Sequence, residues 1–289
     1  MRPHPDLSGT APKPTWLPIA LGSLLRLVQI WMPVVGVHSW RQADTAAMAR
    51  HFSQAGTPIW LPQIDWGGAS AGFVESEFPL YPFLVSRLYS LIGVEEWLGR
   101  GLSVLCSALT IWLMMRLGRR WFSPEAGWWA GMAFAIAPLG VYYGRAFQAE
   151  ALLVLCAAGA LEAHSIWVER RKAWAVSLSW ICFSTAALIK VIPLLWLGLP
   201  LLLVQLTPSP LAKAESPQQI LQRLLRLTLN PWFWVYASTA LAVTSAWYLH
   251  AYQLGEASGL TFGFWGEDSD RSNIGLALNL SSWVNLAIR

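Results

Sequence analysis

The chain has 289 residues, of which 55% are hydrophobic and 12% are charged, and its formal net charge is +4. Charged residues are about half as common as in soluble domains, and the 19 tryptophans are far more than such domains carry. This composition argues against a soluble protein and predicts an all-α, polytopic integral membrane protein. It gives no reason to expect a nucleic-acid partner, because the predicted membrane topology accounts for the positive charge.

Windows of about 20 apolar residues predict roughly seven membrane spans within a single multi-span domain that covers residues 1–289. The first span is too long, and the segment before it too rich in proline, for a cleaved signal peptide. In chain order the expected spans are residues 16–37, 99–117, 126–143, 150–168, 174–189, 191–206 and 231–252.

Clusters of Lys and Arg indicate which loops face the cytoplasm, because short loops rich in these residues stay on that side. They occur in alternate loops and, with Arg2 and Lys13, predict a cytoplasmic amino terminus. The loop 38–98, the turn 144–149, the turn at Lys190 and the tail after residue 252 are then external. The cytoplasmic clusters are Arg116, Arg119 and Arg120, then Arg170, Arg171 and Lys172, then Lys213, Arg223 and Arg226.

The long external loop begins with residues 38–52, for which we expect a short helix at the membrane surface. On such a helix Asp44 lies on an apolar face, where a carboxylate is costly unless something pairs with it. Asp44 is therefore a candidate site residue. The residues expected to share its face are Trp40, Ala47, Met48 and His51. Those expected to point elsewhere are Arg41, Thr45 and Arg50.

The remainder of this loop is rich in glycine, proline and aromatic residues, which favour turns and contacts with the lipid headgroup layer. We expect Asp65 and Glu75 to be ordinary solvated charges. For Glu77, which precedes Phe78 and Pro79, a role in a site and an ordinary surface position both remain open.

A second group of polar residues occupies the external turn 144–150, which opens into the apolar helix 151–166. Glu150 can serve a site, or it can interact with the dipole of this helix. Arg145 and Lys190 stand out because the other short external loops are nearly free of positive charge. They can extend to lipid phosphates, or they can join the external carboxylates in a site for a phosphorylated substrate.

No metal site is predicted from local spacing. Asp44, Glu77 and Glu150 could supply oxygen ligands to a divalent cation, but their spacing matches no known loop site. The three cysteines, Cys106, Cys156 and Cys182, each lie alone in an apolar span and are expected to be small buried hydrophobic residues.

Two segments outside the spans complete the predicted organisation. Residues 207–230 contain three prolines and an amphipathic run, and they are expected to form a cytoplasmic linker followed by a helix on the membrane surface. Residues 253–289 are expected to begin an external loop.

Three motifs in this order resemble bacterial glycosyltransferase family 39, which is related to protein O-mannosyltransferases and to lipid A aminoarabinose transferases. They are HSWRQADT at residues 38–45, ESEFPLYP at 75–82 and RAFQAE at 145–150. The resemblance runs from about residue 36 to residue 206. It implies a C-type glycosyltransferase membrane fold in a bacterial plasma membrane. It also implies transfer of a sugar from a polyprenyl-phosphate donor to a glycan, lipid or protein at the external face.

The resemblance also implies roles for individual residues. Asp44 corresponds to the proposed general base, which would activate a hydroxyl or amine of the acceptor for direct, inverting attack on the sugar. Arg145 and Lys190 would stabilise the departing phosphate, and Glu77 and Glu150 would orient the acceptor or hold a cation. The family commonly has Met-Pro where this chain has Gln148-Ala149.

Members of the wider fold continue for several more spans, so this chain, which ends at Arg289, is expected to be truncated.

Two other functions fit the same composition. A transporter or flippase for lipid-linked sugars would also have many spans and a few charges, but transporters tend to bind substrate near the bilayer midplane. In this chain the candidate charged residues are instead all expected at the external surface of the membrane. They are Asp44, Glu77, Arg145, Glu150 and Lys190. A structural subunit of an envelope-assembly complex would have no need for a carboxylate on an apolar face.

Overall fold

The computed structural model describes residues 13–34, 39–206 and 229–262, together with Gln218, Gln222 and Leu225. Most of the predicted linker 207–230 and the tail 263–289 lie outside the described residues. The helices are α1 (Trp16–Leu27), α2 (Ser39–Gln54), α3 (Leu80–Ile92), α4 (Glu96–Trp121), α5 (Pro124–Ile136), α6 (Pro138–Tyr143), α7 (Glu150–Arg170), α8 (Ala173–Ile189), α9 (Pro193–Trp196), α10 (Gly198–Leu206) and α12 (Pro231–Ser258).

Four of the predicted spans coincide with single helices, namely α4, α7, α8 and α12. Within the described residues, α4 and α7 are long and apolar enough to cross a membrane, as judged by length and composition. Shorter apolar helices include α1, α3 and α8. The surface helix predicted from residue 38 onward is α2, and it runs two residues further than expected, to Gln54.

The other three predicted spans are interrupted, each for a local reason. The first helix ends at Leu27 and is followed by Gln29 with a φ of 63°, a left-handed conformation that a continuing helix cannot contain. The span 126–143 breaks at Ala137, whose ψ of 122° reflects the steric effect of Pro138 on the preceding residue. The span 191–206 starts late, at Pro193, and divides into α9 and α10.

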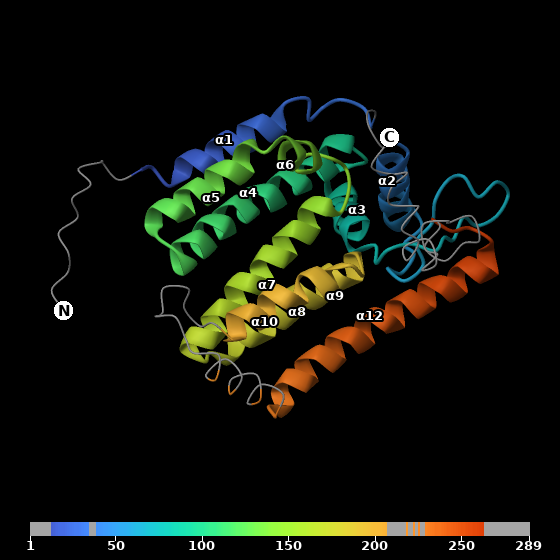
Figure 1. The fold of residues 1–289 in the computed structure, drawn as a ribbon. Helices are drawn as coiled ribbons and strands as arrows, with labels where there is room; N and C mark the ends of the chain where they lie inside the picture. Colours follow the sequence, from blue (N-terminus) through green and yellow to red (C-terminus); the bar gives the residue numbers. More distant parts are fainter. Residues whose placement is uncertain are drawn as a thin grey trace, which may run out of the picture.

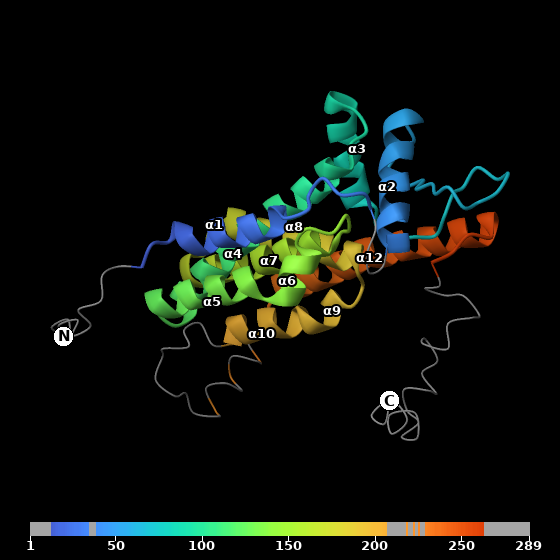
Figure 2. The ribbon, with the colours of Figure 1, turned by 90° about the horizontal axis from the view of Figure 1, so that it is seen from above.

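The helices form a bundle with two helices lying across one end of it. Helix α4 packs against α1, α5 and α7, α7 packs against α8 and α10, and α12 packs against α8. Figure 1 shows this arrangement, and Figure 2 shows that α2 and α3 run across the direction of the bundle helices at one end. The 144–149 turn and Lys190 lie at this end.

Small residues allow α4 and α5 to approach closely. A Cβ atom added at Gly118 would lie 2.7 Å from the Cα of Gly127, so neither position has room for a side chain. Close backbone approach at small residues is a common way for helices to associate in membranes, where lipid gives little hydrophobic drive for association.

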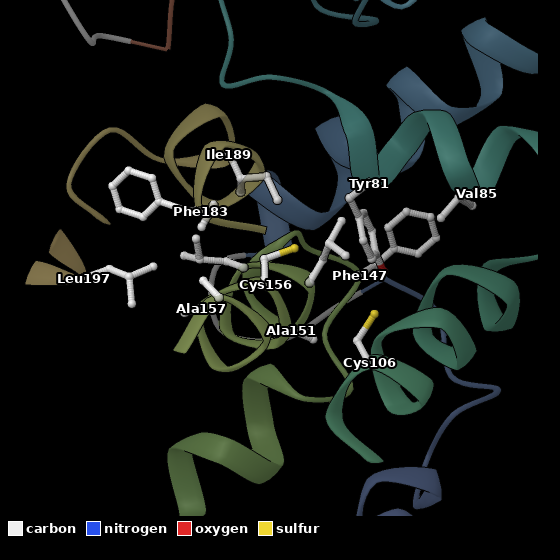
Figure 3. Close-up of a cluster of buried hydrophobic side chains, with 14 of the residues drawn as sticks. Tyr81, Val85, Cys106, Phe147, Ala151, Cys156, Ala157, Phe183, Ile189 and Leu197 are labelled. Carbon is white, nitrogen blue, oxygen red and sulfur yellow. The ribbon is translucent and has the colours of Figure 1, made fainter. Parts of the chain in front are cut away.

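The main hydrophobic core surrounds α7. Figure 3 shows that Tyr81 of α3 and Phe147 stand beside one end of α7, with Phe183 and Ile189 of α8 nearer the other side. Cys106 and Cys156 are buried and Cys182 is half-buried, all three as free thiols. The expectation that the cysteines act as small apolar residues is confirmed.

The opposite end of the bundle carries the described basic clusters. Arg120 Nη2 donates to Glu162 Oε1 at 2.9 Å, and Arg116 Nε donates to the same oxygen at 2.9 Å. These pairs join the C-terminal halves of α4 and α7, and in Figure 1 the C-terminal ends of both helices lie away from α2 and α3. The cluster of Lys213, Arg223 and Arg226 lies outside the described residues, so the predicted alternation of basic loops stays a prediction.

Candidate active site

A pocket of about 540 Å³, including its open mouth, lies where α2, the start of α3 and the turn before α7 meet. Most of its lining comes from three segments that are far apart in the sequence. The lining residues are Arg41, Asp44, Thr45, Met48, Ser76, Glu77, Phe78, Pro79, Pro82, Gln148, Ala149, Glu150 and Phe262.

The first wall is one face of α2. Its four residues, Arg41, Asp44, Thr45 and Met48, have the i, i+3, i+4, i+7 spacing of a single helical face. The expectation that Arg41 and Thr45 point away from Asp44 was wrong, and this spacing was the signal that could have corrected it. Trp40, which was expected beside Asp44, is 56% exposed instead.

Asp44 is half-buried, and this burial raises the pKa of its carboxyl group above the ordinary value. A hydrogen bond to Trp66 opposes the rise in pKa, the charge of Asp65 adds to it, and the charge of Arg41 opposes it. A carboxylate with a raised pKa is a better proton acceptor than an ordinary surface aspartate.

The pocket floor is formed by residues 76–79, with Glu77 as its charged group. Arg41 Nη2 donates to Glu77 Oε1 at 3.0 Å, and the Glu77 side chain is only 19% exposed. Burial raises the pKa of Glu77, and the charges of Arg41 and Lys190 oppose that rise. Glu77 was expected either in a site or at an ordinary surface position, and the structure places it in the lining of a pocket.

Backbone contacts hold this floor in place. Phe78 N donates to Leu188 O at the end of α8 at 3.2 Å, and Trp247 Nε1 of α12 donates to Ser76 O at 3.2 Å. The floor is thus attached to two bundle helices and has a fixed position relative to them.

The second wall is the turn that leads into α7. Glu150, the first residue of α7, accepts a hydrogen bond from Lys190 Nζ at 2.9 Å. Lys190 follows the last residue of α8 in an extended conformation. The pair is mostly buried, with side-chain exposures of 26% for Lys190 and 20% for Glu150. Glu150 thus belongs to a mostly buried ion pair, and as the first residue of α7 it also occupies a position that the helix dipole favours.

Hydroxyl and amide side chains satisfy the polar backbone of this turn. Ser103 Oγ donates to Ala146 O at 2.7 Å, and Ser107 Oγ donates to Gly144 O at 3.2 Å. From α2, Gln42 Oε1 accepts a hydrogen bond from Phe147 N at 3.0 Å. Gln42 therefore links the two walls of the pocket directly.

Arg145 does not line the pocket. Its Nη1 atom donates to the carbonyl of Val28, just after α1, at 2.6 Å. Of the five predicted site residues, the structure brings together Asp44, Glu77 and Glu150 around the pocket and Lys190 beside it.

Of the two acidic residues of the loop that were expected to be solvated, Asp65 is exposed as expected and Glu75 is not. Glu75, predicted to be solvated, is 3% exposed: its carboxylate accepts a hydrogen bond from Thr261, and its N–H donates to Leu260 O at 2.9 Å. Asp65 is more exposed but is hydrogen-bonded to Arg50 and to His51. The contact with Glu75 fixes the segment after α12, which carries Phe262 into the pocket lining.

An apolar groove of about 1230 Å³ lies close to the pocket. Leu188 O accepts hydrogen bonds both from Phe78 N of the pocket floor and from Tyr248 Oη of the groove, at 3.2 and 3.4 Å. The groove lining includes Val191, the residue that follows Lys190 in the chain. Its lining residues are Val191, Leu194, Leu241, Thr244, Ser245, Tyr248, Leu249 and Tyr252.

Within the part of the chain that the structure describes, no group of three or more His, Cys, Asp or Glu side chains is arranged to hold a metal ion. Two carboxylates of the pocket form ion pairs instead, Glu77 with Arg41 and Glu150 with Lys190.

Comparisons with known proteins identify the family and a similar fold. Residues 76–250 match the family model described as dolichyl-phosphate-mannose-protein mannosyltransferase. Two crystal structures of ArnT from Cupriavidus metallidurans are similar in fold, one bound to undecaprenyl phosphate and one in the apo state, with TM-scores of 0.58 and 0.57. Sequence identity is 20% to both, and each alignment covers 83% of this chain and 41% of the ArnT chain. A comparison with curated proteins gave no match.

Proposed function

The chain belongs to the dolichyl-phosphate-mannose-protein mannosyltransferase family, and from this premise we propose that it is a membrane glycosyltransferase. The reaction proposed is transfer of a sugar, a hexose or a pentose, from a polyprenyl-phosphate donor to a hydroxyl or amine of a glycan, lipid or protein. The observation that carries the proposal is the arrangement of Asp44 and the Lys190–Glu150 pair around one pocket, next to an apolar groove.

The groove and the pocket match the two halves of such a donor. A polyprenyl chain is apolar and long, and the groove between the start of α9 and α12 is lined mainly by apolar and aromatic side chains. A phosphate at the end of that chain would lie near Lys190, the cation at the start of the groove. The sugar would then extend into the pocket. The fold of this chain is similar to that of ArnT, a protein crystallised with undecaprenyl phosphate.

The proposed step is a direct displacement. The acceptor oxygen or nitrogen attacks the anomeric carbon, Asp44 takes the acceptor proton, and the bond between that carbon and the phosphate oxygen breaks. The electron pair leaves with the polyprenyl phosphate, whose charge Lys190 stabilises. Glu77 and Glu150 orient the acceptor. Because attack and departure occur on opposite faces of the carbon, the anomeric configuration is inverted.

In this step the positive charge that stabilises the departing phosphate comes from a side chain of this chain, Lys190.

The pocket is proposed to face the outside of a bacterial plasma membrane. The described basic residues near the ends of α4 and α7 lie at the end of the bundle opposite the pocket. By the positive-inside rule that end is cytoplasmic, and the amino terminus is then cytoplasmic as well.

A transfer assay tests the proposed function. Membranes that contain the protein are expected to move a labelled sugar from undecaprenyl phosphate to an extractable glycan, lipid or protein fraction, and membranes that lack it are not. The product should have the opposite anomeric configuration to the donor. Movement of the labelled donor across the membrane without transfer would favour a flippase, and a retained configuration would exclude direct displacement.

The pH dependence of transfer should be set by the raised pKa of Asp44. Since the base acts when deprotonated, kcat/KM is expected to fall as the pH drops through this pKa, above the range of an ordinary aspartate. Arg41→Gln removes a charge that lowers the pKa of Asp44 and of Glu77. It should therefore move the acid limb of the pH–rate profile to higher pH.

The control for this profile is Arg50→Gln. Arg50 lies on the same helix but pairs with Asp65 and does not line the pocket. Its profile should match that of the wild type. An acid limb that stays in place or moves to lower pH in Arg41→Gln would contradict the assignment of Asp44 as the base.

A further inference from the structure

Gln148 is a buried pocket residue whose side chain is incompletely hydrogen-bonded. Its residue exposure is 3%, and it lines the pocket beside Glu150. In the part of the chain that the structure describes, its Nε2 atom has no hydrogen-bond partner. Buried amide donors in folded proteins are nearly always paired, because an unpaired one has lost its hydrogen bonds to water. An unpaired donor on a residue that lines a pocket therefore points to a ligand acceptor.

The other polar side chains of the pocket already have partners within the protein. Thr45 Oγ1 donates to Arg41 O at 2.7 Å, and Ser76 Oγ donates to Glu77 O at 2.9 Å. Arg41 and Lys190 are paired with the carboxylates Glu77 and Glu150, respectively. The Gln148 amide nitrogen differs from these groups in having no hydrogen-bond partner among the described residues.

We propose that Gln148 is a sugar-specificity residue, whose Nε2 atom donates a hydrogen bond to a hydroxyl oxygen of the donor's sugar. The inference rests on the proposed glycosyltransferase function and adds the group that recognises the sugar. A sugar hydroxyl both donates and accepts. The ionised carboxylates of the pocket can only accept from it, so recognition also requires a donor.

The neutral amide suits the sugar better than the phosphate. A phosphate oxygen is bound more strongly by a charged donor, and Lys190 is the cation that stands at the start of the apolar groove. A site that hydrogen-bonds a substrate hydroxyl also rejects analogues that lack it, since the buried amide is then left unpaired.

The test compares Gln148→Met with Gln148→Glu and with the control Gln54→Met. Methionine keeps the length of the side chain without a hydrogen-bond donor, and glutamate replaces the donor with an acceptor. Gln54 is the exposed last residue of α2. For each full-length variant in membranes, kcat and KM are measured with an undecaprenyl-phosphate-linked sugar, and binding is measured with undecaprenyl phosphate that carries no sugar.

Both Gln148 variants are expected to lose about tenfold in kcat/KM, the effect of one hydrogen bond, with binding of the sugar-free lipid unchanged. Gln54→Met should behave as the wild type. The thermal stability of Gln148→Met should equal or exceed that of the wild type, since the substitution removes an unpaired buried donor.

Three outcomes would overturn the proposal. Transfer by Gln148→Met and Gln148→Glu at the wild-type rate would show that the amide does not bind the sugar. Equal weakening of sugar-free lipid binding would assign the contact to phosphate. Loss of activity in step with loss of thermal stability in both variants would indicate a structural role. If the proposed glycosyltransferase function were wrong, the wild type itself would show no transfer, and this result differs from all three outcomes for Gln148.

Discussion

Replacing Asp44 with asparagine is expected to lower sugar transfer by about 10²- to 10⁴-fold without unfolding the protein, the range typical of losing a general base. Asparagine has nearly the same size, but its amide cannot take a proton from the acceptor. Asp44 is half-buried and shares its helix face with Arg41, so its geometry should survive the change. The measurement is transfer of labelled sugar at matched protein levels, together with thermal stability and binding of undecaprenyl phosphate.

The matched control is Asp65→Asn. Asp65 belongs to the same external loop but is hydrogen-bonded to Arg50 and His51 and does not line the pocket. It should retain most of the transfer activity. Equal transfer by Asp44→Asn and the wild type would remove Asp44 from the mechanism and make a transport function the better explanation of the fold.

Replacing Lys190 with methionine is expected to weaken the use of the donor, raising its KM by about tenfold or more. A charge-assisted hydrogen bond to phosphate is worth about 1.5–3 kcal/mol, and methionine supplies none. Lys190 precedes Val191, which lines the apolar groove, and its Nζ atom donates to Glu150 Oε1 at 2.9 Å. The measurement is the transfer rate as a function of donor concentration.

The double variant Lys190→Met with Glu150→Gln separates phosphate binding from simple ion pairing. The readout is binding of undecaprenyl phosphate that carries no sugar, because Glu150 is also proposed to orient the acceptor. If Lys190 served only to neutralise Glu150, removing both charges would restore this binding, because no unpaired buried carboxylate would remain. If Lys190 binds phosphate, binding stays weak in the double variant even where its thermal stability recovers. Lys172→Met is the matched control, because Lys172 flanks the other end of α8 and should be neutral.

The helices could be predicted from the sequence because hydrophobic length is a local property. The apolar stretches at 99–117, 150–168 and 174–189 are all helical. The sequence also contained the signals for two of the errors. Pro138 disfavours helical conformation at Ala137, and Arg41 lies three residues before Asp44, a spacing that places both on one face of a helix.

Pairing between distant segments could not be predicted in the same way. Glu150 and Lys190 were both expected to be external, but their hydrogen bond depends on how α7 and α8 pack together. Glu75 was expected to be solvated, and it is buried because residues 260–261 return to it from beyond α12. Arg145 was expected in a phosphate site, and its guanidinium instead donates to Val28 O.

By itself, the sequence determined the membrane character of the protein, the order of its helices, and the end of the bundle at which the unusual charges gather. These follow from composition, apolar length and the alternation of basic loops, all of which are read along one stretch of chain at a time. Only the tertiary structure decided which charges face one pocket, which are paired, and which amide is left without a partner. Those outcomes depend on contacts between helices and loops that are far apart in the chain, and local residue patterns do not specify such contacts.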